Sequence, residues 1–460
     1  MALSQAADTI EMGAGEDILA RIERLPLSAW QIKTRIIVGT ATFFDAFDAL
    51  AIAYVLPAIR PLWHLTGPQT GILISAGYVG QLIGALAGGL IAERVGRRPV
   101  ILISTLWFGL ISLACGFAWN YESLLVLRLV QGLGLGAEVP IAATYISELS
   151  RARGRGAFVL LFELIFPVGL VAAAVLGRWI VPNLGWQYLF FLGGVPALLV
   201  LAMMRNLPES PRWLAARGRS RDAEEAMAFI ESKVAAAIGR HLPAIVPLSV
   251  APAAKRAEWR ELFGATYRAR TLVIWTAWFA TYFANYGLAT WLPTVYQEVF
   301  KLSLGEALSY AIATPALGLA SSFACALLID RSGRRIWFTA ALAWSAGGFL
   351  LLWWIGPSSA QRVMVLTTFS YMGISTLSLA LYLYTAELYP TRVRALGTGT
   401  ATAWLRLASI LGPQVFGNAR VGTDIGGPFL TFGFVLLAAC VVVGLFATET
   451  KGRVLEEISP

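Results

Sequence analysis

Long apolar stretches recur along the whole chain. Between Ile36 and Ala447 the sequence contains successive segments with few or no charged residues. Each is about 18–26 residues long, and about 20 helical residues at 1.5 Å per residue cross a hydrocarbon core of about 30 Å. Runs such as Val168 to Leu176 are apolar on every side, whereas strands of a membrane barrel alternate apolar and polar residues. The pattern therefore predicts an all-α membrane protein.

The stretches predict about twelve transmembrane helices in two six-helix bundles. The expected helices cover 36–59, 71–92, 99–118, 122–149, 155–180, 186–205, 271–297, 306–329, 336–356, 361–387, 394–420 and 428–447. The expected domains are a cytoplasmic N-terminal segment (1–35), the N-terminal bundle (36–205), a cytoplasmic linker with short helices (206–270), the C-terminal bundle (271–447) and a cytoplasmic tail (448–460). Within the first segment, Ile18 to Ile32 predicts an amphipathic helix at the membrane interface, because Ile18, Leu19, Ile22 and Leu25 share one side.

Composition and charge placement support a membrane location. Apolar residues make up 57% of the chain and charged residues 14%, against about 25% charged in ordinary soluble domains. The net charge of +9 does not indicate a nucleic-acid partner, because the basic residues collect in alternate connections between apolar stretches. By the positive-inside rule the basic side is cytoplasmic, with both termini on it, in a multi-pass inner-membrane protein. The acidic start, with Asp8 and Glu11, does not resemble a cleaved signal peptide.

The two halves repeat in sequence. The segment from Gly89 to Arg98, Gly-Leu-Ile-Ala-Glu-Arg-Val-Gly-Arg-Arg, returns as Ala-Leu-Leu-Ile-Asp-Arg-Ser-Gly-Arg-Arg from Ala326 to Arg335, 237 residues later. An acid followed seven residues later by a base occurs after the fourth expected helix and again after the tenth, 239 residues later: Glu148 with Arg155 and Glu387 with Arg394. Such an offset indicates two copies of one six-helix unit.

These loop motifs resemble the signature of the major facilitator superfamily. Three further motifs resemble one branch of it: Pro-Glu-Ser-Pro-Arg-Trp-Leu (208–214), the run from Arg128 through Gly132, Gly134 and Gly136, and Thr-Glu-Thr-Lys-Gly-Arg-Val-Leu-Glu-Glu (448–457). That branch holds sugar porters, organic-ion transporters and aromatic-acid or nicotinate-type proton symporters. The stretch 282–293 lacks the glutamines of sugar porters, and Phe-Asp-Ala-Phe-Asp (44–48) resembles the two-aspartate signature of aromatic-acid symporters. The resemblance implies the fold and alternating access.

Charged residues inside the expected helices are candidates for proton coupling, because an ionisable group at mid-membrane costs about 2.5–3.5 kcal/mol. Asp45 and Asp48 lie about 15–20 Å into the first helix and share a face. At least one is expected to accept the proton, unless both only fix a neighbouring helix. The resemblance implies that Asp48 pairs with Arg128, either as a coupling switch or as a permanent structural pair. Glu138 is a candidate second proton site or substrate contact, unless it is neutral and bonded to a neighbouring helix.

Arg406 favours an anionic substrate. It lies 12 residues past Arg394, or about 18 Å along a helix, too deep for its charge to reach the surface. Its planar guanidinium suits a carboxylate, although it could instead pair with Asp45, Glu138 or Glu163. Other candidate substrate contacts are the helix faces and the glutamate that could line a pocket, each of which packing or the interfacial aromatic belt could explain instead: Glu163, Tyr282, Asn285, Tyr286, Tyr371 and Ser375.

The paired loop charges are candidates for a cytoplasmic gate. Salt bridges between helices could hold the inside closed in one state and break in the other, although capping and topology would explain the same residues. The predicted gate consists of Glu93, Arg97, Glu148, Arg155, Asp330, Arg334, Glu387 and Arg394.

The sequence thus predicts a proton-coupled symporter that imports a small organic acid, an aromatic or heteroaromatic carboxylate, as a monomer in the lipid bilayer. Alternatives are a sugar or organic-cation transporter, a drug antiporter, or a nutrient sensor of the same fold. An enzyme finds no support, because no nucleophile–base set occurs. Three scattered cysteines and two histidines do not predict a metal site, so protons are the expected coupling ion and no cofactor is expected.

Overall fold

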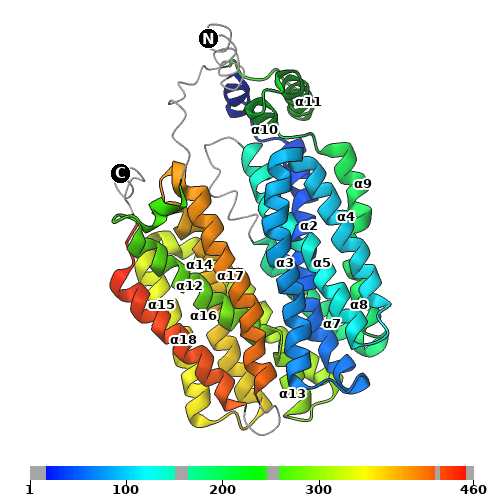
Figure 1. Ribbon diagram of the computed structural model, residues 1–460, viewed down its shortest axis with the longest axis vertical. Helices are drawn as coiled ribbons and strands as arrows, with labels where there is room; N and C mark the ends of the chain where they lie inside the picture. The colour runs from blue at the N-terminus through cyan, green and yellow to red at the C-terminus, as the bar shows by residue number, and fades with distance from the viewer. Residues whose placement is uncertain (1–16, 151–163, 246–257, 420–424, 452–460) are drawn as a thin grey trace.

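The chain folds into two helical bundles that lie side by side (Figure 1). The computed structural model describes residues 17–150, 164–245, 258–419 and 425–451, and in these ranges the regular structure is helical. The first bundle contains α2 (Ala29–Leu62), α3 (Gly67–Val95), α4 (Arg97–Gly116), α5 (Tyr121–Glu148), α7 (Ile165–Asn183), α8 (Gln187–Gly193) and α9 (Pro196–Asn206). The second contains α12 (Arg268–Ala289), α13 (Leu292–Glu298), α14 (Leu304–Ser332), α15 (Arg334–Ile355), α16 (Ala360–Leu388), α17 (Thr391–Asn418) and α18 (Gly426–Phe446).

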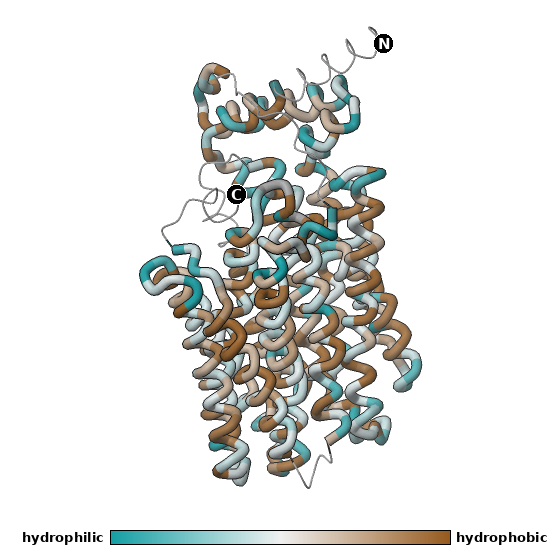
Figure 2. The backbone as a smooth tube through the Cα atoms, turned by 60° about the vertical axis from the view of Figure 1, so that its left-hand side comes forward, coloured by the Kyte–Doolittle hydropathy of each residue, from teal (hydrophilic) through white to brown (hydrophobic). Residues whose placement is uncertain are grey.

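These helices correspond to the twelve spans that the apolar pattern predicts, although residues 155–163 of the expected fifth span lie outside the described residues. In the described ranges, ten helical segments are long and apolar enough to cross a membrane. α12 and α17 are not among these ten, and both contribute polar side chains, such as Asn285 and Arg406, to the central cavity. Large apolar side chains such as Leu90, Leu198 and Trp354 are exposed along the outer faces, and brown, apolar segments run the length of the bundles (Figure 2). This surface suits contact with lipid acyl chains.

Local sequence explains where the helices begin. Ser28, Thr66 and Ser303 each cap a helix, and a glutamine or glutamate three residues later completes the capping box. At α4 and α15 a glycine takes this place instead. Gly96 and Gly333 have φ values of +112° and +90°, which disfavour residues with a Cβ. The repeated Gly-Arg-Arg motif therefore starts the third helix of each half in the same way.

The sixth and seventh spans are each broken into two helices. α8 ends at the Gly193–Gly194 pair, and α9 begins with Pro196. α12 ends at Ala289, four residues before Pro293, which occupies the second position of α13. A proline ring would clash with the carbonyl group four residues earlier in a continuous helix, so the chain starts a new helix at α13. The continuous span expected from 271 to 297 is corrected accordingly.

Short helices cover one end of the first bundle, here called the linker end (Figure 1). They are α10 (Pro211–Ala216) and α11 (Ser220–Ile238), and the 3₁₀ helix η1 (Trp259–Phe263) precedes α12. The face called the opposite end lies beside α13. The expected helix from Ile18 to Ile32 differs from the structure, because helical residues 17–23 are separated from α2 by a short connection. The apolar side chains of Ile18, Ile22 and Leu25 pack in one cluster with Trp213 of α10 and with Met227 and Ile230 of α11.

Candidate functional site

A buried cluster of charged and polar groups occupies the middle of the first bundle. Arg128 of α5 donates to Asp48 of α2 at 2.6 Å, and Gln131 donates to the other carboxylate oxygen at 2.8 Å. The Ser112 hydroxyl donates to that second oxygen at 3.4 Å. The Asp48 and Arg128 side chains are 1% and 3% exposed. Thus the expected pair forms, and both oxygens of Asp48 have partners.

Close helix packing brings Arg128 to this position. α3 and α5 meet along a line of glycines, and a Cβ added at Gly132 would collide with backbone atoms of Gly77 and Gln81. Arg128 lies one turn before Gly132, and its guanidinium lies beside Gly77. Small residues let helix backbones approach closely in membranes. The Arg-x-x-x-Gly spacing therefore places the charge at the α3–α5 contact, from which it reaches α2.

Two other carboxyl groups have a different environment. Asp45 lies one turn before Asp48 on α2, and its Oδ1 atom has no hydrogen-bond partner among the described residues. Glu138 of α5 is 0% exposed, and neither of its carboxyl oxygens has a partner of good geometry in the same part of the chain. The polar groups that act on Glu138 are Asp45 and the Thr42 hydroxyl. These carboxyl groups therefore lack the ion pair that fixes Asp48.

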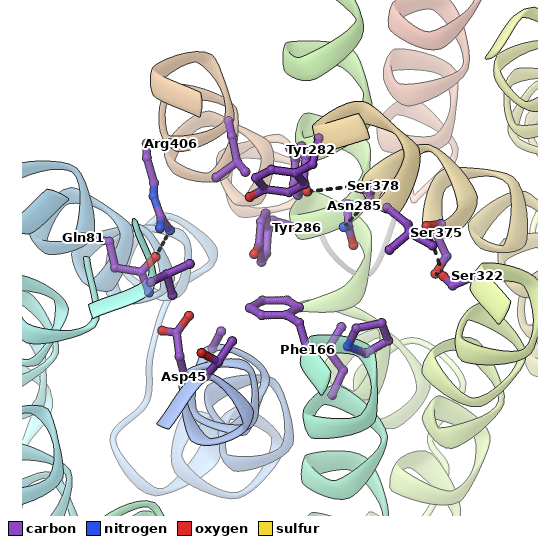
Figure 3. Close-up of a pocket in the computed structure, with 18 of the residues that line it drawn as sticks. Asp45, Gln81, Phe166, Tyr282, Asn285, Tyr286, Ser322, Ser375, Ser378 and Arg406 are labelled. Carbon is purple, nitrogen blue, oxygen red and sulfur yellow. Dashed lines mark hydrogen bonds between the residues drawn. The ribbon is translucent and has the colours of Figure 1, made fainter. Parts of the chain in front are cut away.

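A cavity lies between the halves, at the level of Asp45 (Figure 3). Its empty space is about 860 Å³, a volume that includes the open side. Helices of both halves contribute to the wall. The first half supplies Asp45, Gln81 and Phe166, and the second supplies Tyr286, Tyr371 and Arg406.

Arg406 of α17 provides the cavity with a positive charge. It is half-buried and hydrogen-bonds to the side-chain oxygen of Gln81 of α3, across the boundary between the halves. Asp45 is close enough for electrostatic attraction, but Arg406 forms no ion pair with any residue that the structure describes. Figure 3 shows Arg406, Gln81 and Asp45 on one side of the cavity. The guanidinium thus keeps donors available to a bound anion.

Aromatic rings line the cavity beside Arg406. Tyr286 stacks on Tyr282 with ring centroids 5.9 Å apart and lies 4.8 Å from the ring of Tyr78 in the other half. Trp278 continues the stack behind Tyr282 at 5.4 Å. In Figure 3 the rings of Tyr286 and Phe166 occupy the middle of the cavity. This arrangement offers flat surfaces to a planar ligand.

Hydroxyl and amide groups line the far side. Asn285 donates to the Ser378 hydroxyl at 3.4 Å, and the hydroxyl groups of Ser322 and Ser375 are 2.7 Å apart. Tyr371 lies next to Gly318, where an added Cβ would come within 2.7 Å of the ring. The predicted substrate contacts Tyr282, Asn285, Tyr286, Tyr371, Ser375 and Arg406 therefore line one cavity. Glu163 lies outside the described residues.

Contacts between the halves close the cavity toward the opposite end. Ser75 donates to the carbonyl oxygen of Ile410 at 2.7 Å and accepts from Gln414 at 2.9 Å. Arg60 of α2 pairs with Glu298 of α13 at 2.5 Å. By contrast, the ribbons of the two halves diverge toward the linker end (Figure 1). These contacts join the two halves between the cavity and the opposite end.

Each half carries a charge cluster at the linker end. In the first half, Arg97 pairs with Glu93 at 2.9 Å and with Glu148 at 3.1 Å, and Glu209 accepts from the Arg97 backbone N–H at 3.0 Å. The Tyr145 hydroxyl donates to the Pro208 carbonyl oxygen at 2.7 Å. Three residues of the predicted gate, Glu93, Arg97 and Glu148, thus join helices within one half.

The second half repeats this cluster. Arg334 pairs with Asp330 and with Glu387, both at 2.8 Å, and its backbone N–H donates to Glu449 at 2.9 Å. The Tyr384 hydroxyl donates to the Thr448 carbonyl oxygen at 2.6 Å. Burial alone would raise the pKa of Glu449, but hydrogen bonds from four backbone N–H groups outweigh it and hold the pKa below its usual range. Arg394 donates to the Tyr389 carbonyl oxygen at 3.4 Å, and Arg155 lies outside the described residues.

The profile of the family described as "Sugar (and other) transporter" matches residues 40–460. The chain belongs to this major facilitator family. It is 33% identical over 452 residues to the niacin transporter NiaP of Acinetobacter baylyi, covering 96% of this chain and 99% of the relative. It is 31% identical over 444 residues to the 4-hydroxybenzoate transporter PcaK of Pseudomonas aeruginosa, covering 94% of each. The inward open conformation of the xylose transporter XylE from E. coli has the same fold, with a TM-score of 0.71, 18% identity and coverage of 93% and 99%.

Several site residues of this major facilitator transporter were not predicted from its sequence. Gln131 and Gln81 carry no charge, so nothing in the composition distinguished them from other helix residues, although Gln131 lies one turn after Arg128. Glu209 and Glu449 cap α4 and α15 in equivalent ways. They lie 240 residues apart, close to the repeat offset, and this spacing would have identified them as partners of the repeated loops.

Proposed function

We propose that this transporter is a proton-coupled importer of a small aromatic or heteroaromatic carboxylate. The observation that carries the proposal is Arg406, which faces the central cavity without an ion pair among the described residues. A guanidinium in a partly dehydrated site binds a carboxylate through two charge-assisted hydrogen bonds. An organic anion would supply the partner that the structure does not.

The rings around Arg406 support an aromatic substrate. A flat ring could lie against Tyr286 and Phe166 while its carboxylate binds Arg406, an arrangement that uses both dispersion and charge. The names of the relatives agree with this class, because niacin and 4-hydroxybenzoate are both planar aromatic acids. A saturated acid would gain the ion pair but lose the stacking, so affinity should fall when the ring is removed.

The carboxyl groups of α2 support proton coupling. Asp45 shares the cavity with Arg406 and lies within its electrostatic reach. A bound carboxylate would neutralise Arg406 and add a negative charge near Asp45, so that substrate and proton would each favour binding of the other. Asp48 would move with Arg128 as the helices of the first half rearrange, which extends the coupling to alternating access.

We place the linker end in the cytoplasm and the protein in the inner membrane, because the basic connections collect at that end. In this orientation the contacts Ser75–Gln414 and Arg60–Glu298 close the outer side, and the cavity faces inward. Import requires a second state in which these contacts break and the linker-end charges of both halves come together as the predicted gate. We propose that a monomer completes this cycle.

Uptake into proteoliposomes tests the proposal. Labelled nicotinate, 4-hydroxybenzoate, benzoate, cyclohexanecarboxylate, glucose and a quaternary amine are each offered under an inward proton gradient, with protein-free liposomes correcting for passive entry of the acids. We expect gradient-driven uptake of an aromatic carboxylate, lost in Arg406→Gln. Uptake of glucose or the amine would replace the substrate class, and binding without flux would favour a sensor.

A further inference from the structure

One buried acid has no part in the ion pair or in the substrate contacts. Glu138 is fully buried, its two oxygens have no hydrogen-bond partner of good geometry among the described residues, and it does not line the cavity. A buried carboxylate without a counter-charge costs several kcal/mol, whereas a protonated carboxyl group avoids most of that cost. Such an acid at mid-membrane requires a function or a partner.

The position of Glu138 connects the cavity with the linker end. Along α5 it lies ten residues after Arg128 and ten before Glu148, about 15 Å from each along the helix axis. Glu148 belongs to the charge cluster at the linker end. The neighbouring Val139 lines the cavity. Glu138 is therefore halfway between the buried pair and the linker-end surface, directly behind the cavity wall.

The facing helix supplies a continuous set of polar groups. Thr42 and Asp45 of α2 both line the cavity, and both act on Glu138. Because α2 starts at the linker end, Thr42 lies about 4.5 Å nearer to that end than Asp45. Asp45, Thr42 and Glu138 thus follow one another from the cavity toward the linker end.

The charges around these two acids differ. Asp45 experiences Arg406 of α17, Arg128 of α5 and Asp48 of its own helix, and Tyr78 of α3 and Tyr286 of α12 lie within its electrostatic reach. For Glu138 the charged neighbour is Asp45. Substrate binding at Arg406 therefore acts on Asp45 directly and reaches Glu138 only through Asp45.

We propose that Glu138 is a proton relay between Asp45 and water at the linker end. The inference rests on the proposed proton symport. The O–H bond of Asp45 breaks as an O–H bond forms on Glu138, directly or through the Thr42 hydroxyl, and Glu138 then gives the proton to water. Asp48 does not take this role in the present state, because Arg128, Gln131 and Ser112 occupy both its oxygens. Glu138 acts on proton release and makes no contact with substrate.

The test compares exchange with net transport in proteoliposomes that contain Glu138→Gln. Exchange of labelled for unlabelled 4-hydroxybenzoate and of nicotinate, at equal pH on both sides, requires substrate binding and movement of the halves but no net proton release. Accumulation driven by an inward proton gradient requires release. We expect Glu138→Gln to keep exchange within about twofold of wild type and to lose accumulation by at least about tenfold, because removal of a proton-transfer group slows the step it serves.

Two further variants separate the relay from a structural role. Glu138→Asp keeps a carboxyl group and should recover part of the accumulation. Glu122→Gln removes an exposed acid at the other end of the same helix and should behave as wild type.

Three results would overturn the relay. They are accumulation by Glu138→Gln at the wild-type level, loss of exchange together with accumulation, and failure of Glu138→Asp to recover any accumulation. If wild-type protein itself shows no response to a proton gradient, the proposed symport fails instead, and that result is read from the wild-type arm alone.

Discussion

The two halves of the molecule are alike at the linker end and different in the middle. Arg97 and Arg334 hold equivalent acid partners, and Glu209 and Glu449 cap equivalent helices. In these clusters the same helix ends are held in the same way in both halves. Matching clusters of this kind are expected if each half moves as a rigid unit.

In the middle, equivalent positions carry different chemistry. Asp45 and Asp48 of α2 lie 237 residues before Tyr282 and Asn285 of α12, the same offset as the repeated loops. The first half therefore has carboxylates where the second has a ring and an amide that line the cavity. We infer that the first half handles protons and the second half supplies most substrate contacts, with Arg406 within electrostatic reach of Asp45.

The largest expected effect comes from removing the buried ion pair of the first half. Asp48→Asn should destabilise the protein by about 3–5 kcal/mol, because it leaves Arg128 buried without its counter-charge. It should also abolish accumulation driven by a proton gradient. Denaturant unfolding in detergent and proteoliposome uptake measure the two effects. The double variant Asp48→Asn/Arg128→Met should recover part of the stability but no coupling, and an Asp48→Asn protein that still accumulates substrate in response to imposed pH would rule out the coupling role.

The next largest effect comes from removing the positive charge that the second half contributes to the cavity. Arg406→Gln should weaken carboxylate binding by about 1.5–3 kcal/mol, or roughly 10- to 100-fold in Kd, because one charge-assisted partner is lost. The affinity of Arg406→Lys should lie between those of the wild type and Arg406→Gln, since an ammonium group keeps the charge but lacks the planar fork. Calorimetric titration with nicotinate and 4-hydroxybenzoate measures this. Wild-type affinity in Arg406→Gln for every carboxylate that binds would exclude the arginine as the anion site.

A smaller effect tests whether the helix caps at the linker ends of the two halves are equivalent. Glu209→Gln and Glu449→Gln should each cost about 1 kcal/mol, because each weakens a carboxylate that accepts from backbone N–H groups at a helix start. Thermal unfolding should show similar losses for the two variants and none for the exposed control Glu225→Gln. A large loss for one variant alone would mean that the two caps are not equivalent.

The sequence predicted more about the repeated parts than about the cavity. Apolar length and a fixed offset predicted the spans and their repeat, since a helix that crosses the membrane is apolar along most of its length. The Asp48–Arg128 pair followed from charge and family resemblance. Gln81, Gln131 and Ser322 were missed, because a neutral polar residue gives no signal until the facing helix is known.

The N-terminal segment shows a second limit of sequence patterns. An apolar stripe on residues 18–25 predicts burial, but the same stripe fits lipid or protein, and here α10 and α11 cover it. Charge complementarity was the missing signal. Arg21 and Arg24 both bind Glu231 of α11, at 2.9 Å and 2.6 Å, which ties the segment to the linker helix.

The smallest expected effect concerns this contact, which has no counterpart among the described residues of the second half. Burial alone would raise the pKa of Glu231, but hydrogen bonds from Arg21 and Arg24 outweigh it and lower the pKa. Because the pKa of Glu231 is lowered, its carboxylate stabilises docking of the segment at neutral pH. This contribution is lost as the pH falls below the usual glutamate pKa of about 4.3 and through the pKa of the folded state.

Distance measurements between spin labels at exposed positions 17 and 236 should detect this loss. The distribution should broaden below about pH 4 and should be broad at all pH values in Glu231→Gln. A narrow distribution in that variant at neutral pH would show that the apolar contacts alone hold the segment.

The most direct test of the account is proton movement caused by substrate. Proteoliposomes loaded with a pH-sensitive dye are given an inward gradient of 4-hydroxybenzoate or nicotinate with no imposed pH difference, and Arg406→Gln liposomes correct for the acid that crosses the bilayer unaided. The account predicts acidification of the interior at a rate that follows substrate entry and exceeds the control. Substrate entry with no acidification above that control would contradict proton-coupled import.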